Sequence, residues 1–210
     1  RPPVFRNTGG LRVAVWQDNA YGAAPILAHL EQVEGIDAAP LWNLRRESLA
    51  ACQVVVLCQP RVRRELFKNE EAARELARFV ERGGGLLTLH ALVGIRDYPP
   101  PVPTVATGDE ALAGSAWQVA GYHAITKDLD RQQTYVSTFG DRVGVVPGAR
   151  GRTIARTPEG VPVVAAGLSS RGRYAACGLG LGIGPGDKDV PLSPAEAVLL
   201  EGMLRWLGNR

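Results

Sequence analysis

The chain is poor in cysteine and in aromatic residues. Only 6% of its 210 residues are aromatic, and its three cysteines, Cys52, Cys58 and Cys177, form no Cys-x-x-Cys pair. An odd number of widely spaced cysteines argues against a disulfide framework and against a zinc site. We therefore expect three buried thiols in a reducing compartment, which favours a cytoplasmic location.

The sequence also lacks a long apolar run and an uninterrupted basic patch. The net charge is +3, and the densest basic run, residues 61–64, is followed by Glu65, Glu70 and Glu71. Nucleic-acid binding favours continuous positive charge with stacking aromatics, and a membrane-spanning helix needs about 20 apolar residues. We expect a soluble domain that binds neither nucleic acid nor a membrane.

Motifs that bind phosphate are missing as well. The alternating glycines of residues 178–186 contain no Gly-x-Gly-x-x-Gly register, and Gly-x-x-x-x-Gly-Lys-Ser/Thr does not occur. Pro185 and Gly186 lead into a loop rather than into a helix that would hold a phosphate at its N-terminus. We expect no cofactor, and we interpret these glycines as positions where the backbone passes close to the turn at His90.

The first half of the chain predicts an α/β fold. After a lead-in over residues 1–10, apolar runs at 11–16, 36–42, 54–58 and 84–90 alternate with helical patterns at 23–33, 44–52 and 70–82, the last capped by Asn69. This alternation is typical of a doubly wound parallel sheet. With 45% hydrophobic residues, residues 11–210 fit one domain.

The second half predicts a different pattern. A proline-rich segment at 98–103 opens an expected long loop through residue 115. Extended segments at 134–139, 143–146, 152–156, 161–166 and 173–177 are separated by turns, so we expect antiparallel hairpins attached to the parallel core. Ser193, Pro194 and Glu196 then start a final helix with a capping box, and we expect its Trp206 to lie in the core.

Two residues stand where buried strands end. His90 follows the run Leu86-Leu87-Thr88-Leu89, and Cys58 follows Val54-Val55-Val56-Leu57. Ligands of open α/β sheets gather at the carboxyl ends of the strands, which makes His90 the first candidate for chemistry or binding. The alternative for His90 is a hydrogen bond to a neighbouring loop with no further role. We interpret Cys58 as a packed thiol rather than a nucleophile.

The order of elements resembles the class I glutamine amidotransferase-like superfamily, and within it the ThuA-like (trehalose-utilisation) group. The similarity is carried by four segments: residues 84–90, His123-Ala124-Ile125-Thr126, residues 172–180, and Leu204-Arg205-Trp206-Leu207 in the final helix. It implies a flavodoxin-like sheet. It also places His90 at the turn where amidotransferases carry their nucleophilic cysteine.

The chain departs from these relatives at the positions that matter for catalysis. The amidotransferase histidine would follow Cys177, where Gly178 and Gly180 stand instead. Neither partner of a Cys–His pair is present, so the resemblance implies a non-canonical domain that does not hydrolyse glutamine. The proline of the ThuA-like His-Pro-Ile-Thr segment and the acidic pair that follows it are also missing, with Gln132 and Gln133 in place of the acids.

Three functions remain open from the sequence. The first is a binding or accessory domain for a small polar or sugar-like ligand, held at the carboxyl end of the sheet by Asp18, Asn19, His90, Trp117, Tyr122 and His123. The second is a structural or oligomerisation domain of a larger protein, since the chain begins at Arg1. The third is an enzyme on a carbohydrate-related substrate, with His90 or His123 as general base and Asp18 orienting it. The histidines lie in separate predicted elements, so we expect no metal site.

Overall fold

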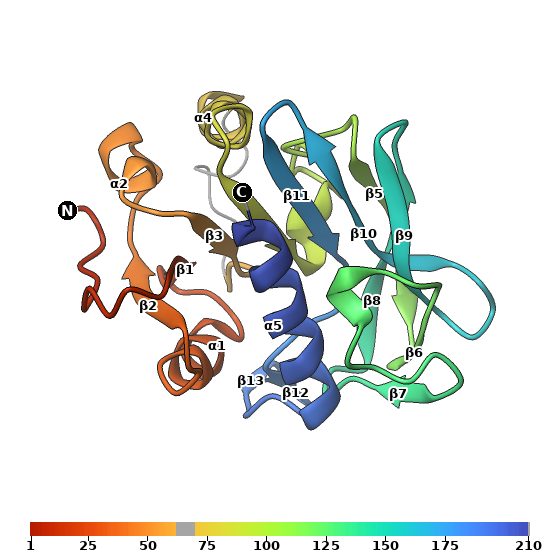
Figure 1. Cartoon of the computed structure of the whole chain (residues 1–210). Coiled ribbons are helices and arrows are strands. Elements are labelled where there is room, and N and C mark those ends of the chain that lie inside the picture. The colour runs from red at the N-terminus through yellow and green to blue at the C-terminus, as the bar shows by residue number, and fades with distance from the viewer. Residues whose placement is uncertain (62–69, 210) are drawn as a thin grey trace.

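A large mixed sheet forms the centre of the molecule (Figure 1). The structure, a computed structural model, describes residues 1–61 and 70–209; the basic positions 62–64 and the expected cap Asn69 lie outside the described residues. The strand order in this nine-stranded sheet is β2-β1-β3-β4-β11-β10-β9-β6-β7. Its first five strands are parallel: β2 (Ile36–Leu41), β1 (Leu11–Trp16), β3 (Val54–Leu57), β4 (Gly85–Leu89) and β11 (Gly172–Cys177). The predicted parallel pairing of the first four is confirmed.

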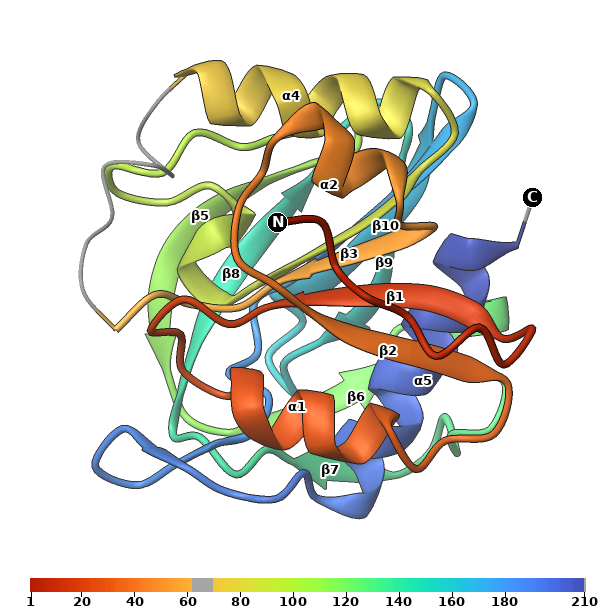
Figure 2. The same ribbon diagram turned by 90° about the vertical axis from the view of Figure 1, so that its left-hand side faces the viewer.

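Helices cover both faces of the parallel half. Figures 1 and 2 show α2 (Arg46–Ala50) and α4 (Glu70–Glu81) on one side, and α1 (Ala23–Leu30) and α5 (Pro194–Gly208) on the other. β3 and β4 are buried on both faces, which explains the apolar runs in their sequences. Within the described residues, no helix is long and apolar enough to cross a membrane.

The second half of the chain extends the same sheet with antiparallel strands. β10 (Pro162–Ser169) pairs with β11, and β9 (Gly151–Arg156), β6 (Ala116–Val119) and β7 (Thr134–Val136) follow outward. β5 (Ala106–Ala113) and β8 (Asp141–Pro147) form a separate antiparallel pair, as do the short strands β12 (Ile183–Gly184) and β13 (Lys188–Asp189). Single-turn 3-10 helices follow β4, as η1 (His90–Val93), and β6, as η2 (Ala124–Thr126).

One expectation for this half was wrong. The segment 98–115 is not one long loop, because β5 occupies most of its second part and is held by pairing with β8 rather than by apolar alternation. The expected antiparallel hairpins are present, because β9 pairs with β10 and β10 with β11, and β11 attaches them to the parallel core through β4.

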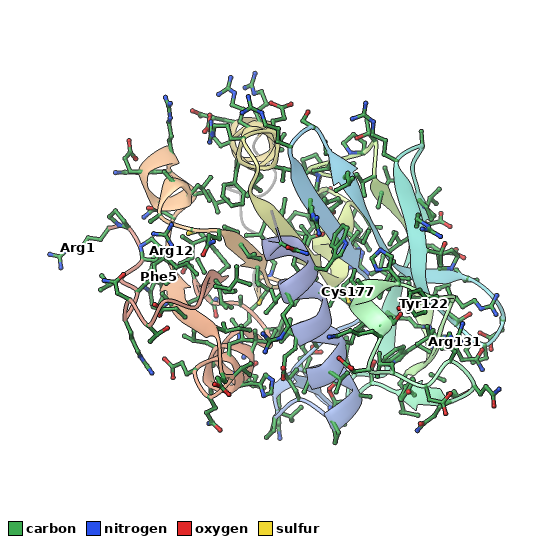
Figure 3. The ribbon with its side chains drawn as sticks, in the orientation of Figure 1. Arg1, Phe5, Arg12, Tyr122, Arg131 and Cys177 are labelled. Carbon is green, nitrogen blue, oxygen red and sulfur yellow. The ribbon has the colours of Figure 1, made fainter. Side chains whose placement is uncertain are left out.

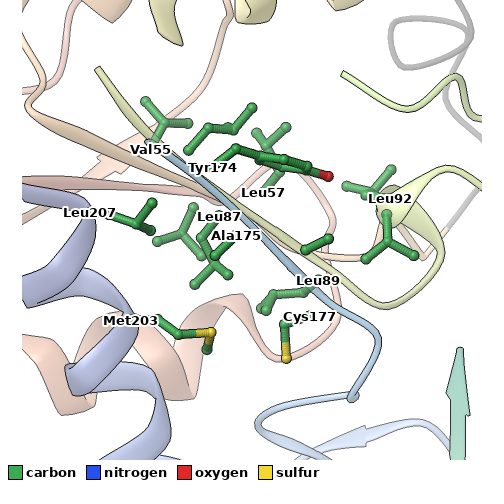
Figure 4. Packing of buried hydrophobic residues seen from close by; sticks show 14 of the residues in the cluster. Val55, Leu57, Leu87, Leu89, Leu92, Tyr174, Ala175, Cys177, Met203 and Leu207 are labelled. Carbon is green, nitrogen blue, oxygen red and sulfur yellow. The ribbon is translucent and has the colours of Figure 1, made fainter. Parts of the chain in front are cut away.

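The C-terminal helix α5 packs against one face of the parallel strands. Met203 and Leu207 of α5 are buried beside Leu87 of β4 and Ala175 of β11 (Figure 4). Burying a side chain of this kind contributes about 1.5–3 kcal/mol. The helix end lies so close to β4 that a Cβ on Gly85 would come within 2.7 Å of the Leu207 carbonyl oxygen. Trp206, expected in the core, is only partly buried.

Candidate functional site

The turn after β4 holds His90 in an unusual backbone conformation. β4 ends at Leu89, and His90 then has a φ of 50°, in the left-handed region that non-glycine residues rarely adopt. Such a conformation costs about 1–3 kcal/mol and persists only where the surrounding structure enforces it. The ring of His90 is buried and meets the ring of Phe139 edge-on, with 5.6 Å between the centroids. A strained, buried histidine at a strand end is a candidate for function.

The surroundings of the His90 ring favour its uncharged form. Burial lowers the pKa of His90, and the nearby Asp141 carboxylate offsets this only in part. Neither ring nitrogen forms a hydrogen bond to any residue that the structure describes. The alternative that His90 serves to tie down a neighbouring loop by hydrogen bonding is therefore not supported by the described residues.

The backbone N–H of Ala91, the residue after His90, already forms a hydrogen bond. The N–H of Ala91 donates to Oε1 of Gln59, which follows β3, at 3.1 Å. In hydrolases with a nucleophile on a turn of this kind, the N–H of the next residue helps to stabilise the oxyanion. Here that donor is occupied.

Beneath the turn, Thr88 and Tyr174 share a buried hydrogen bond of 2.8 Å that ties β4 to β11.

The alternating glycines lie near the same turn. A Cβ on Gly180 would approach the ring of Phe139 to 2.6 Å, and Phe139 is the residue that contacts His90. A Cβ on Gly178 would lie 1.9 Å from the Val143 carbonyl oxygen. Gly180 therefore packs against the residue that contacts His90, as interpreted from the sequence, whereas Gly178 packs against the β8 backbone and not against the His90 turn.

A cleft of about 530 Å³ lies beyond the carboxyl ends of β1 and β2, between the first turns of α2 and α4. We call it the Asp18 cleft. Its lining combines polar and aromatic residues with two aliphatic ones: Trp16, Asp18, Trp42, Asn43, Leu44, Arg45, Arg46, Glu47, Glu71, Ala72 and Glu75. Trp42 is 58% exposed, an unusual exposure for so large an apolar side chain. Asn43 positions the loop, since its Oδ1 accepts hydrogen bonds from the Ser48 hydroxyl at 2.8 Å and the Arg45 N–H at 3.1 Å.

The six residues proposed from the sequence do not gather in one place. Asp18 lines the Asp18 cleft, whereas the adjacent Asn19 has a φ of 48° and accepts a hydrogen bond from the Arg61 N–H through its carbonyl. Trp117 is fully buried on β6, beyond β11, β10 and β9 from His90, and stacks on Tyr135 at 4.8 Å.

The last two of the six lie on the chain between β6 and η2. Tyr122 is 78% exposed on the outer surface (Figure 3). His123 contacts Trp206 of α5, with 5.4 Å between the ring centroids, and lines a different cleft from Asp18.

The sequence reading missed Trp42 and Gln59. Trp42 directly follows β2, and Gln59 lies just beyond the end of β3. The rule that singled out His90, a polar or aromatic residue at the end of a buried parallel strand, applies equally to them.

The cysteines are buried thiols, as expected. Burial raises the pKa of Cys52 and of Cys177 to about 12, and it raises that of Cys58 further. A thiol with so high a pKa is not a nucleophile at neutral pH. In the part of the chain described, no three His, Cys, Asp or Glu side chains are grouped closely enough to hold a metal ion.

No protein-family model and no curated protein matches the chain. Solved structures do. A ThuA-like protein from Bacteroides uniformis matches with a TM-score of 0.68 and 12% identity, over 99% of this chain and 95% of that one. A ThuA-like protein from Parabacteroides merdae matches with a TM-score of 0.63 and 15% identity, over 95% and 91%. A β-galactosidase from Bacillus circulans matches with a TM-score of 0.60 and 13% identity, over 95% of this chain but 31% of the enzyme. The chain therefore has the fold of ThuA-like proteins.

Proposed function

We propose that this chain is a binding domain of ThuA-like fold that takes a small sugar-like ligand in the Asp18 cleft and does not hydrolyse glutamine. The observation that carries the proposal is that an exposed indole, Trp42, and Asp18 line the same cleft at the carboxyl end of parallel strands. An aromatic ring offers an apolar face for a sugar ring, and carboxylates accept hydrogen bonds from hydroxyl groups.

The place of the cleft in the sheet supports this choice. The parallel half has the order β2-β1-β3-β4-β11, which favours a flavodoxin-like arrangement. In such sheets the ligand lies beyond the carboxyl ends of the strands, near the point where the chain crosses from one side of β1 to the other. The volume of about 530 Å³ also falls in the usual range of ligand pockets.

Three observations support the absence of glutaminase activity. His90 stands where the nucleophilic cysteine of amidotransferases would be, and the Ala91 N–H beside it already donates to Gln59. Cys58, at the end of the adjacent strand, is fully buried and has a raised pKa. A hydrolytic centre would need a reactive thiolate and a free oxyanion donor together.

The proposal is tested by titrating the protein with monosaccharides and disaccharides, trehalose among them, while recording tryptophan fluorescence. We expect a saturable change that is lost in Trp42→Ala and weakened in Asp18→Asn. Tyr122→Ala removes an exposed aromatic outside the cleft and serves as the matched control. A change that persists in Trp42→Ala, or no saturable change with any saccharide, would refute the proposal.

A second candidate is an accessory domain of a longer polypeptide. The likeness to the Bacillus circulans β-galactosidase favours it, because this fold makes up only about a third of that enzyme. In that case a second copy or another domain would cover part of the surface. Light scattering across a concentration series tests whether a second copy covers the surface. A monomer at all concentrations would argue against such self-association. The enzyme alternative has less support, since His90 has no titratable hydrogen-bond partner among the described residues.

A further inference from the structure

A second cleft, of about 550 Å³, lies on the face of the sheet that α5 covers. We call it the basic cleft. It is lined by residues of the antiparallel half and of α5: His123, Arg150, Arg152, Ala166, Gly167, Leu168, Ser170, Arg173 and Trp206. Arg152 belongs to β9, Leu168 to β10 and Arg173 to β11, so three neighbouring strands contribute to one wall.

The strand register explains why two of the arginines meet there. Arg152 pairs with Ala166, and Arg173 pairs with Leu168, two residues further along β10. Directly paired residues share a face of the sheet, and residues two apart on one strand do so too. Arg152 and Arg173 therefore project from the same face, and the small Ala166 between them leaves the space open.

Trp206 and Arg173 hold each other in place at one side of this cleft. Arg173 Nη1 donates to the Trp206 carbonyl at 2.7 Å, and its guanidinium carbon lies 5.1 Å from the centre of the indole ring. His123 meets the same indole edge-on. His123 Nδ1 accepts the N–H of Ile125 at 3.2 Å, so in the neutral ring Nε2 carries the proton and acts as a donor.

The charges in the basic cleft are of one sign. Its lining contains three arginines and no acidic residue. Within the described chain, neither Arg150, Arg152 nor Arg173 forms an ion pair with a carboxylate, although other arginines on the surface do. Positive groups gathered in a concave site without counter-charge attract anions.

We propose that the basic cleft binds the oxyanion group of a small organic ligand, a phosphate or a carboxylate. Arginine guanidinium groups donate paired hydrogen bonds to such groups, and they do so better than lysine. The partly buried Trp206 and the exposed Leu168 supply apolar surface for the organic part of the ligand. A cleft of about 550 Å³ suits a molecule of the size of a sugar phosphate.

This site is distinct from the Asp18 cleft. Arg173 pairs with Gly85, at the start of β4, whereas His90 follows the far end of that strand. The basic cleft therefore lies toward the amino ends of the parallel strands, and the Asp18 cleft lies beyond their carboxyl ends. The two proposals stand on different residues, and either can fail alone.

His123 supplies the readout for the test. Burial lowers the pKa of His123, and the positive charges of Arg152 and Arg173 lower it further. A bound anion offsets those charges, so it raises the pKa of His123. The chain has only three histidines, and their imidazole C–H signals can be followed separately by NMR.

The experiment titrates the full chain at constant ionic strength with glucose 6-phosphate, glucuronate, inorganic phosphate and sodium chloride. We expect glucose 6-phosphate or glucuronate to produce a saturable shift of the His123 signal and a higher His123 pKa. The imidazole C–H signal of His29 should not shift. Chloride should have no saturable effect. Arg152→Gln should weaken binding about tenfold, as expected for one lost charge-assisted hydrogen bond. Trp42→Ala in the Asp18 cleft should leave it unchanged.

Arg156→Gln is the matched control, because Arg156 lies exposed on the same strand but outside the cleft. Equal weakening by Arg156→Gln and Arg152→Gln would show general charge screening and overturn the proposal. Inorganic phosphate binding as tightly as both organic anions would overturn the role of Trp206 and Leu168. A short oligonucleotide binding more tightly than any small anion would overturn the ligand class, and no saturable shift of His123 would overturn the site itself.

Discussion

Gln59 and Ala91 join two strand ends through one hydrogen bond, from the Ala91 N–H to the Gln59 Oε1 at 3.1 Å. The bond fixes the first residue after His90, and thereby supports the left-handed conformation of His90 itself. It also occupies the backbone donor that a hydrolase would use at this turn. A single glutamine side chain thus supports the turn and occupies the Ala91 N–H.

We predict that Gln59→Ala destabilises the protein by about 1–2 kcal/mol, because it leaves the Ala91 N–H without its partner. Urea denaturation followed by circular dichroism measures the effect. Gln32→Ala, at an exposed position after α1, is the control and should change stability little. Equal stability of Gln59→Ala and the unmodified protein would contradict the structural role given to this bond.

We predict that stability falls as the pH falls through the ordinary histidine pKa of 6.5, because burial lowers the pKa of His90 in the folded chain. Between the two pKa values the unfolded chain binds a proton that the folded chain does not, so unfolding is favoured as pH decreases. The contribution is at most about 1.4 kcal/mol per pH unit. Stability measured from pH 8 to pH 5 should show this slope.

His90→Asn separates this contribution from that of His123, whose pKa is also lowered. Asparagine tolerates the left-handed conformation and does not titrate. The variant should fold and show a flatter dependence of stability on pH. An unchanged slope would mean that His90 is not the group responsible.

We predict that none of the three cysteines reacts with iodoacetamide in the native protein at pH 7.5. All three thiols are buried with raised pKa values. Mass spectrometry should show no added mass in the folded chain and three additions in denaturant. Rapid labelling of Cys58 in the folded protein would instead support a reactive thiol at the end of β3.

The capping box of α5 gives a further prediction. The buried Glu196 carboxylate accepts hydrogen bonds from the N–H groups of Ser193, at 2.8 Å, and Thr138, at 3.0 Å. Glu196→Ala leaves both donors unpaired and should cost about 2–4 kcal/mol, whereas Ser193→Ala removes one cap and should cost about 1 kcal/mol. Thermal and urea unfolding compare the two, and an equal or reversed order would be inconsistent with this bonding.

The parallel half could be predicted from the sequence because each of its elements carries its own signal. Two strands buried on both faces have continuous apolar runs, Val54-Val55-Val56-Leu57 in β3 and Leu86-Leu87 in β4. The start of α5 is marked by the capping box from Ser193 to Glu196. β5 could not be predicted, since Ala106-Thr107-Gly108-Asp109-Glu110 has no apolar alternation. Its backbone is held by partners on β8 that lie 28 to 41 residues later in the chain, from Ala113↔Asp141 to Ala106↔Pro147.

The candidate sites were less accessible to sequence reasoning. His90 and Asp18 follow strands of the parallel sheet, so they could be placed at its carboxyl edge from the sequence alone. Trp117 could not be placed, because its burial depends on stacking against Tyr135 from the neighbouring strand β7. The basic cleft depends on the register of β9, β10 and β11, and nothing local to Arg152 or Arg173 in the sequence indicates that they share a face.

Binding of a sugar-like ligand in the Asp18 cleft can be followed through the indole N–H signals of the four tryptophans in ¹⁵N-labelled protein. The saccharide panel is added stepwise and the four signals are followed. We expect the Trp42 signal to shift most and to saturate, while the signals of the buried Trp117 and of Trp206, in the basic cleft, stay in place. A panel that leaves Trp42 unmoved, or that moves Trp206 in its place, would contradict the claim.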